Sequence, residues 1–308
     1  MDKINSGTRN MLEDSLVNSL STDIMAEAAS RLIRGYDIHK RTGIPYGETV
    51  SKKDAASRVI SDIVEARLIP HFITLLVEMQ YIGIMGRKYP ISNLSSIVRE
   101  LQKYGYIFDQ NNRIFIENSR MRITKNWGFL REGQEYVFSF LRFDIIDNTR
   151  LVRSYPESKI KKTFNDFHAI VRESVTKRNG RIWNMEGDGG LAAFHFSERN
   201  LMATLSSMDI LHRLFMYNRT GNKLGEPLQI RMAVHNGHYE YSDSMNTMRE
   251  NEIIKTVHDI ESRYSGPNSV TLSETVSIYL DSLLLDQFQP IRIDSNKNYF
   301  NYSIRIGD

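Results

Sequence analysis

The sequence predicts an α+β protein of two domains. Residues 1–133 show mainly helical periodicity, whereas residues 134–308 alternate between strand-like and helix-like segments. The chain has 308 residues, of which 41% are hydrophobic and 25% are charged, so it is long enough to bury two cores. We therefore place a mainly helical domain at residues 1–133 and a mixed domain at residues 134–308.

Composition excludes several classes of protein. The absence of cysteine excludes disulfides, cysteine zinc sites and thiol catalysis. No apolar run reaches the length of a membrane span, and Met1–Gly7 lacks the apolar core of a signal peptide. The net charge of +3 is too small to require nucleic acid or a membrane surface as a partner. We therefore expect a cytoplasmic protein that binds no membrane.

Helical spacing of apolar residues indicates four helices in the first domain, at Leu12–Ile33, Lys53–Ala66, Pro70–Met79 and Leu94–Tyr104. Ser92 or Asn93 is expected to cap the last of these helices. The polar turn 110–112 then joins two strand-like runs, Tyr106–Asp109 and Arg113–Glu117. Helices closed by a hairpin are typical of a winged-helix-like end. The modest basic charge favours a regulatory or dimerisation role over DNA binding.

The second domain begins with strand, helix, two strands, helix and strand. This is the order of a ferredoxin-like core, in which helices cover one face of a sheet. The predicted segments are a strand to Phe143, a helix Ser158–Thr176, strands Arg181–Met185 and Leu191–Phe196, a helix Asn200–Tyr217, a strand Leu228–His235 and its continuation or partner Gly237–Tyr241. The segments that follow are a helix Glu250–Tyr264, a strand Ser269–Leu272, a helix Glu274–Leu283 capped by Ser273, and strands Phe288–Ile293 and Tyr299–Ile306.

Two carboxylates stand at strand ends in the second domain. Asp144 ends the aromatic strand that begins at Tyr136, and Asp188 lies at the tip of a glycine-flanked turn within Trp183–Phe194. Either residue alone would more often be a helix cap or a hairpin turn. Together they can converge on divalent cations that hold a triphosphate, because Mg²⁺ takes oxygen ligands from carboxylates and substrate phosphates.

Three segments carry a family resemblance. Asp144–Leu151 fits a pattern Asp-Ile-x-Gly-Phe-Thr-x-Leu, and Gly187-Asp188 with Ala192–Phe194 fits a Gly-Asp turn followed by Ala-x-Phe. Leu228–Gly237 fits a strand that reads Leu-x-Ile-Arg-x-Gly-Leu-His-x-Gly. In this order the segments resemble the catalytic domain of class III nucleotidyl cyclases, the adenylate and guanylate cyclases, over roughly residues 134–308.

The resemblance implies a reaction in which a ribose 3′ oxygen attacks the α-phosphate of a nucleoside triphosphate and pyrophosphate leaves. It implies two Mg²⁺ or Mn²⁺ ions bound by Asp144, Asp188 and the backbone carbonyl of Ile145. Backbone N–H groups from Ile145 to Thr149, with Asn148 between them, would bind the phosphates. Active sites of this family form between two catalytic domains, so the resemblance also implies a homodimer.

The chain departs from the family pattern near the phosphates and the base. Asp147 and Asn148 replace the family's Gly and Phe, and Asp147 would repel phosphates unless it faces away or reaches a metal. Asn184 stands where adenylate cyclases carry a base-reading Lys. Its amide both donates and accepts hydrogen bonds, so it can read a different base edge. The alternative for Asn184 is a strand residue whose side chain bonds the backbone.

A larger departure lies in a late helix. Ile254–Asp259 replaces the family's Val-Asn-x-Ala-x-Arg, so Lys255 takes the place of Asn and Asp259 that of Arg. Because an acid cannot stabilise growing negative charge on phosphate, another cation must do so. Lys255, His258 and Arg263 are the nearest catalytic candidates. Lys255 could equally form an ion pair with Asp259, one helical turn away.

Taken together, the residues predict a nucleotidyl cyclase that forms a 3′,5′-cyclic nucleotide. Loss of the purine-reading Lys leaves the base open. In its overall style, the pattern resembles short, divergent bacterial members of the family, the pyrimidine cyclases of Pycsar antiphage systems, which make cyclic UMP or cyclic CMP as second messengers. Adenylate or guanylate cyclase activity is an alternative. A second alternative is an inactive nucleotide-binding regulator, which the Lys255 and Asp259 replacements favour and the retained Asp144 and Asp188 oppose. A third is a DNA-binding regulator that uses the hairpin.

Overall fold

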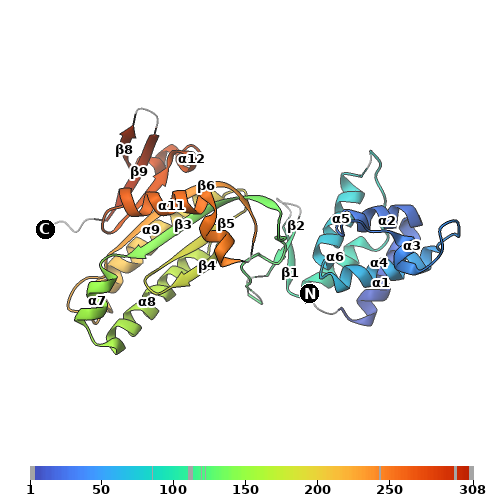
Figure 1. Cartoon of the computed structure of the whole chain (residues 1–308), viewed down its shortest axis with the longest axis horizontal. Helices are drawn as coiled ribbons and strands as arrows, with labels where there is room; N and C mark the ends of the chain where they lie inside the picture. The colour runs from blue at the N-terminus through green and yellow to red at the C-terminus, as the bar shows by residue number, and fades with distance from the viewer. Residues whose placement is uncertain are drawn as a thin grey trace. The chain divides into compact units, whose positions relative to one another are not determined.

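The structure of the chain is a computed structural model. It describes residues 4–84, 86–109, 114–118, 120–121, 123–242, 244–294 and 297–304. The chain divides into two compact units, Met1–Phe129 and Leu130–Asp308 (Figure 1). Among the described residues, no helix has both the length and the apolar character needed to cross a membrane.

The first unit is a group of helices followed by a hairpin. The helices are α1 (Ser6–Ser19), α2 (Thr22–Ser30), α3 (Ile38–Thr42), α4 (Lys52–Glu65), α5 (Ile69–Tyr81) and α6 (Leu94–Lys103). Strands β1 (Tyr106–Asp109) and β2 (Ile114–Glu117) pair antiparallel, which confirms the predicted hairpin. Its predicted turn, 110–112, and Arg113 lie outside the described residues. The core of this unit includes Leu16 from α1, Val59 from α4 and Phe72 from α5, all fully buried.

Two details of the first unit differ from the sequence prediction. The single helix predicted for Leu12–Ile33 is wrong, because the Ser21 hydroxyl accepts the N–H of Ile24 and starts a second helix, α2. Asn93 does occupy the position before α6. However, it has a left-handed backbone with φ of 59° and its side chain makes no cap hydrogen bond.

The second unit is built on a seven-stranded sheet. Its elements are β3 (Glu135–Ile145), α7 (Asn148–Ser154), α8 (Glu157–Thr176), β4 (Arg181–Glu186), β5 (Gly189–Phe194), α9 (Arg199–Thr220), β6 (Ile230–Glu240), α10 (Met245–Glu250), α11 (Glu252–Tyr264), β7 (Ser269–Ser273), α12 (Glu274–Ser277), α13 (Ser282–Leu285), β8 (Gln289–Asp294) and β9 (Lys297–Ser303). The strand order is β4-β5-β3-β6-β7-β9-β8. Strand β3 pairs antiparallel with β5 and β6, in agreement with the predicted ferredoxin-like order.

The two faces of this sheet carry different helices. Leu141 and Phe143 of β3 share a core with Phe167 of α8 and Leu211 of α9. Helix α11 instead packs against β6 and β3 and contacts the side chain of Arg142. Because successive side chains of a strand point to opposite faces, Arg142 and Asp144 both belong to the α11 face. This places the predicted acidic residue away from the α8–α9 core.

The predicted helix Glu250–Tyr264 is confirmed as α11, which begins two residues later because the Asn251 side chain accepts the N–H of Ile253. The predicted helix Glu274–Leu283 is instead divided in two, because α12 ends at Ser277 and Asp281 caps a new helix, α13. The predicted cap at Ser273 is also wrong, because its side chain makes no cap hydrogen bond. Its hydroxyl contacts His235 Nδ1 at 2.9 Å instead.

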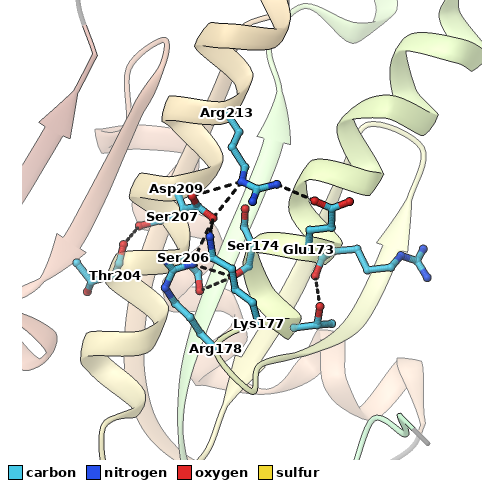
Figure 2. A network of polar contacts seen from close by, with 11 residues as sticks. Glu173, Ser174, Lys177, Arg178, Thr204, Ser206, Ser207, Asp209 and Arg213 are labelled. Atoms are coloured by element: carbon cyan, nitrogen blue, oxygen red, sulfur yellow. Dashed lines mark hydrogen bonds and ion pairs between the residues drawn. The ribbon is translucent and has the colours of Figure 1, made fainter. Parts of the chain in front are cut away.

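A network of charged side chains joins α8 to α9 (Figure 2). The Asp209 carboxylate lies 2.6 Å from Lys177 Nζ and 3.3 Å from both Arg178 Nη1 and Arg213 Nε. Arg213 also contacts Glu173 at 2.7 Å. Asp209 is 19% exposed, so its ion pairs are less screened than those at the open surface. The network therefore ties the two helices that cover one face of the sheet.

The pH dependence of stability tests this network. Burial raises the pKa of Asp209, but its contacts with Lys177 and Arg178 outweigh burial and lower the pKa to about 2. The carboxylate therefore stabilises the fold above its unfolded pKa of about 3.9, and this contribution disappears as the pH falls towards 2. We expect Asp209→Asn to lower the free energy of unfolding by about 1–3 kcal/mol at pH 7.

Urea denaturation of the full chain at pH 7, 5 and 3 measures the effect. The difference between the original chain and Asp209→Asn should be similar at pH 7 and 5 and smaller at pH 3. Asp286→Asn, at an exposed position, is the matched control and should change stability little. An equal effect of the two substitutions would contradict the role given to Asp209.

Candidate functional site

A cavity of about 590 Å³ opens beside the end of β3 in the second unit. It is lined by the end of β3, the loop into α7, α7 itself, the β4–β5 turn and one residue of β6. The lining residues are Asp144, Ile145, Ile146, Asp147, Asn148, Thr149, Arg150, Arg153, Ser154, Asp188 and Arg231. The structure thus brings together five residues proposed from the sequence, namely Asp144, Ile145, Asn148, Thr149 and Asp188. This cavity is the candidate active site.

Backbone geometry brings the two acidic residues together. Asp144 pairs with Gly189 across β3 and β5, and the N–H of Ile145 donates to the carbonyl of Asp188 at 2.9 Å. A Cβ at Gly189 would lie 2.8 Å from Asp144 Oδ1 and 2.8 Å from the Phe143 carbonyl oxygen. Only glycine therefore allows the strand to pass this close to Asp144.

The charge at this point fits a divalent cation. Burial and the nearby Asp188 carboxylate raise the pKa of Asp144, and Arg231 opposes both effects. Asn148 Oδ1 is buried and meets no hydrogen-bond donor among the described residues. The described residues contain no group of three or more His, Asp or Glu side chains that could hold a metal. A cation held by the two acids would take its other ligands from backbone, water or substrate oxygens.

Arg231 is a site residue that the sequence prediction missed. Its Nη2 lies 3.0 Å from Asp144 Oδ2, and its Nε forms an ion pair with Glu261 of α11. Glu261 is 1% exposed and lies 3.9 Å from Arg142 as well. Arg231 therefore sits at the cavity wall in a fixed position. The sequence did contain a signal for this residue, because Arg231 is a charged residue within the otherwise apolar strand of Leu228–Gly237.

The predicted phosphate-binding backbone is wrong for two residues. The N–H groups of Ile145 and Ile146 donate to carbonyls of the β4–β5 turn and of the residue before β6, both at 2.9 Å. They are therefore not available to a ligand. The N–H groups of Asn148 and Thr149 stand in the first turn of α7, where helical amides lack an acceptor within the helix. These two amides remain candidates for binding an anion.

Asp147 adopts the backbone conformation that the family's glycine would favour. Its φ is +56°, in the left-handed region that Asp tolerates better than most residues. Its side chain is 66% exposed and lies 3.9 Å from Arg150, which weakens its repulsion of phosphates. Arg150 in turn donates two hydrogen bonds to the Glu226 carboxylate, at 2.9 and 2.6 Å.

Asn184 lies on the same sheet face as Asp144. It pairs with Leu191, which pairs in turn with Arg142, after a bulge between Ile182 and Asn184. Register partners share a face, so Asn184, Arg142 and Asp144 point the same way. The side chain is half-buried and makes no hydrogen bond within the described part of the chain, which differs from the alternative of a backbone-bonded amide. It does not line the cavity.

The proposed catalytic cations are not assembled in one chain. The side chains of Lys255, His258 and Arg263 are 53%, 58% and 68% exposed, and none lines the cavity. The expected ion pair between Lys255 and Asp259 is wrong, because Lys255 Nζ contacts Glu252 at 2.7 Å. Asp259 instead lies 4.0 Å from Arg263.

Comparison with known proteins gives limited similarity. No protein-family model matches the chain. A stretch of 62 residues is 36% identical to uncharacterized proteins of Mycobacterium tuberculosis and Mycobacterium bovis. This stretch covers 20% of the chain and 12% of those proteins.

Several solved structures are similar over part of the chain. The guanylate cyclase domain of RhGC from Catenaria anguillulae in complex with GTP is 15% identical, covers 56% of this chain and 100% of its own, and gives a TM-score of 0.46. The adenylyl cyclase CyaB from P. aeruginosa is 14% identical, covers 56% of this chain and 96% of its own, and gives a TM-score of 0.45.

Gly189→Ala tests the close approach of the two strands. The added Cβ would meet the Phe143 carbonyl and Asp144 Oδ1, so we expect a loss of about 1–3 kcal/mol in the free energy of unfolding. We also expect weaker Mn²⁺ binding, because Asp144 must move. Urea denaturation and calorimetric Mn²⁺ titration measure the two effects. Gly266→Ala is the control, since its Cβ would meet nothing closer than 3.9 Å. Unchanged Mn²⁺ binding by Gly189→Ala would contradict the geometry.

Proposed function

We propose that the second unit is a nucleotidyl cyclase domain, which converts a nucleoside triphosphate to a 3′,5′-cyclic nucleotide and pyrophosphate. The observation that carries this proposal is the meeting of Asp144 and Asp188 at one cavity, beside the cation of Arg231. Their order and spacing in the chain follow the class III cyclase pattern described above. A cavity with two acids on one side and a cation beside them suits a metal-bound triphosphate.

Six residues of the cavity have a role in this proposal. Asp144, Asp188 and the Ile145 carbonyl would hold two Mg²⁺ or Mn²⁺ ions, which when bound lower the pKa of the ribose 3′ hydroxyl and neutralise phosphate charge. The amides of Asn148 and Thr149 donate to phosphate oxygens. Arg231 supplies positive charge near the same oxygens, where negative charge grows during attack on the α-phosphate.

A homodimer would give the remaining proposed residues a place in the site. Asn184, Lys255, His258 and Arg263 all lie outside the cavity of their own chain. The three cations lie on the exposed side of α11, from which they can reach a second chain. We propose that a second copy completes the site with these residues, and that the helical unit regulates or stabilises the dimer.

The side chain of Asn184 is the basis for proposing which nucleobase the substrate carries. An amide can present either a donor or an acceptor, so it can satisfy uracil or cytosine, which differ at one ring edge. We therefore propose a pyrimidine cyclase that makes cyclic UMP or cyclic CMP as a second messenger in antiphage defence.

A second candidate function is an inactive domain that binds nucleotide and regulates a partner. The observation that favours it is Asp259, an acid at the position of the family's phosphate-stabilising Arg. The two functions are separated by incubating the purified full chain with ATP, GTP, CTP or UTP and Mn²⁺ and resolving the products. Cyclic product supports the cyclase. Nucleotide binding without product supports the inactive regulator.

Removal of either acidic ligand should abolish cyclisation. We expect Asp144→Asn and Asp188→Asn each to reduce the rate by at least about a hundredfold, because loss of groups that merely support a metal ligand already costs 10- to 100-fold. Chromatographic assay of cyclic product with Mn²⁺ measures the rate, and a thermal melt checks that each variant is folded. Asp286→Asn should keep full activity. A double variant at Asp144 and Asp188 that still forms product would show that the metal assignment is wrong.

Asn184→Ala should alter base preference more than turnover. A site that hydrogen-bonds a base edge rejects the wrong base because a mismatch leaves buried polar groups unpaired, at about 1–3 kcal/mol each. We expect the ratio of kcat/KM between the preferred and the other triphosphates to fall by about tenfold or more. Competition assays with all four triphosphates measure this ratio. An unchanged preference with a lower overall rate would mean that Asn184 is structural.

A further inference from the structure

A second cavity lies wholly within the first unit. It has a volume of about 440 Å³ and is bordered by α5, the end of α2, strand β2 and the last residue of the unit. Its lining residues are Arg31, Leu32, Pro70, His71, Thr74, Leu75, Glu78, Ile114, Phe115 and Phe129. Cavities of about 300–1,000 Å³ hold small organic ligands in many proteins. The proposed cyclase function does not involve this site.

The walls of the cavity are mainly apolar. Leu75 of α5 and Phe115 of β2 are 7% and 1% exposed, and both belong to the core of the unit. Because α5 packs against β2, these two side chains sit on facing elements and fix the shape of the cavity. A ligand enclosed here would bury an apolar body against aliphatic and aromatic side chains.

Most polar groups of the cavity already have a partner in the protein. Thr74 Oγ1 donates to the Pro70 carbonyl at 2.9 Å, and His71 Nε2 contacts the Phe129 carbonyl at 2.5 Å. Arg31 forms an ion pair with Glu27 at 3.2 Å. These contacts lie within the unit and do not need a ligand.

Glu78 differs from these groups. Its half-buried carboxylate receives no hydrogen bond and forms no ion pair within the described part of the chain. Burial raises the pKa of Glu78, and the charge of Arg31 acts in the opposite direction. On α5, Glu78 lies one helical turn from Thr74 and Leu75, which line the cavity with it, and Leu75 is buried. A carboxylate in such a place is costly unless a donor or a cation reaches it.

We propose that this cavity binds a small amphipathic molecule, whose apolar body fills the space between α5 and β2 and whose amine donates to Glu78. An organic cation is preferred to an anion, because the carboxylate is unengaged whereas the nearby guanidinium of Arg31 is paired. A cation over Glu78 gains a charge-assisted hydrogen bond that a neutral molecule of the same shape lacks. The chain would thus carry a ligand site separate from its acidic cavity.

The experiment uses the full chain and three aromatic amines of increasing size, namely benzylammonium, phenethylammonium and tryptammonium. Each is titrated calorimetrically, and the ring contacts are followed by ligand-observed NMR. 2-Phenylethanol and 3-phenylpropionate are the neutral and anionic counterparts of phenethylammonium. We expect saturable binding of at least one amine, and for phenethylammonium an affinity about tenfold or more above that of the alcohol and higher still above that of the acid.

Three variants locate the binding. Glu78→Gln keeps the shape of the side chain and should weaken amine binding by about tenfold or more while leaving alcohol binding unchanged. Thr74→Phe fills the cavity without altering the carboxylate and should abolish binding of amine and alcohol alike. Glu48→Gln, at an exposed position of the same unit that does not line the cavity, should bind as the original chain does.

Each outcome decides the proposal. Selective loss of amine binding in Glu78→Gln, with loss of all binding in Thr74→Phe, supports it. Failure of all three amines to saturate, or equal binding of amine and carboxylate, overturns it. Unchanged amine binding in either Glu78→Gln or Thr74→Phe also overturns it. None of these measurements depends on cyclase activity, so the result is independent of the function proposed for the second unit.

Discussion

The acidic cavity depends on one buried carboxylate, Glu261, which holds two arginines from neighbouring strands. Glu261 is 1% exposed and contacts Arg142 of β3 and Arg231 of β6, and Arg231 in turn contacts Asp144. Burial raises the pKa of Glu261, and the two arginines counteract this effect. Loss of one partner from a buried ion pair costs about 3–5 kcal/mol, because the other charge is left without compensation. These ion pairs therefore hold α11, β3 and β6 in fixed positions relative to one another where the cavity opens.

The sequence predicted the order of elements well because the apolar periodicity changes sharply between helices and strands. It failed where one periodic segment contains two helices. Ser21 and Asp281 each lie inside such a segment, and each begins a new helix through a side-chain hydrogen bond to a backbone N–H. A single short polar residue does not interrupt the periodicity, so the pattern alone could not show these breaks.

The site was predictable to the extent that it depends on short motifs. Asp144 and Asp188 stand at strand ends, and the sequence shows this directly. The position of Arg231 depends on the pairing of β3 with β6, which joins residues 87 positions apart. The hydrogen bonds that occupy the Ile145 amide depend on the β4–β5 turn. The contacts of an exposed side chain such as Lys255 depend on the molecules that meet it in solution. The sequence pattern of one chain does not contain this information.

The central position of β3 also affects how the second unit can fold. On one side β3 pairs with β5, where Ser139 lies opposite Phe194. On the other side it pairs with β6, which comes much later in the chain: His238 of β6 contacts Glu135 of β3, 103 residues away in sequence. Until β6 has left the ribosome, β3 is an edge strand with unpaired backbone groups and several aromatic side chains. Pairings over such long separations form slowly. Emergence of residues 230–240 from the ribosome therefore gives β3 its second partner and removes this unpaired edge.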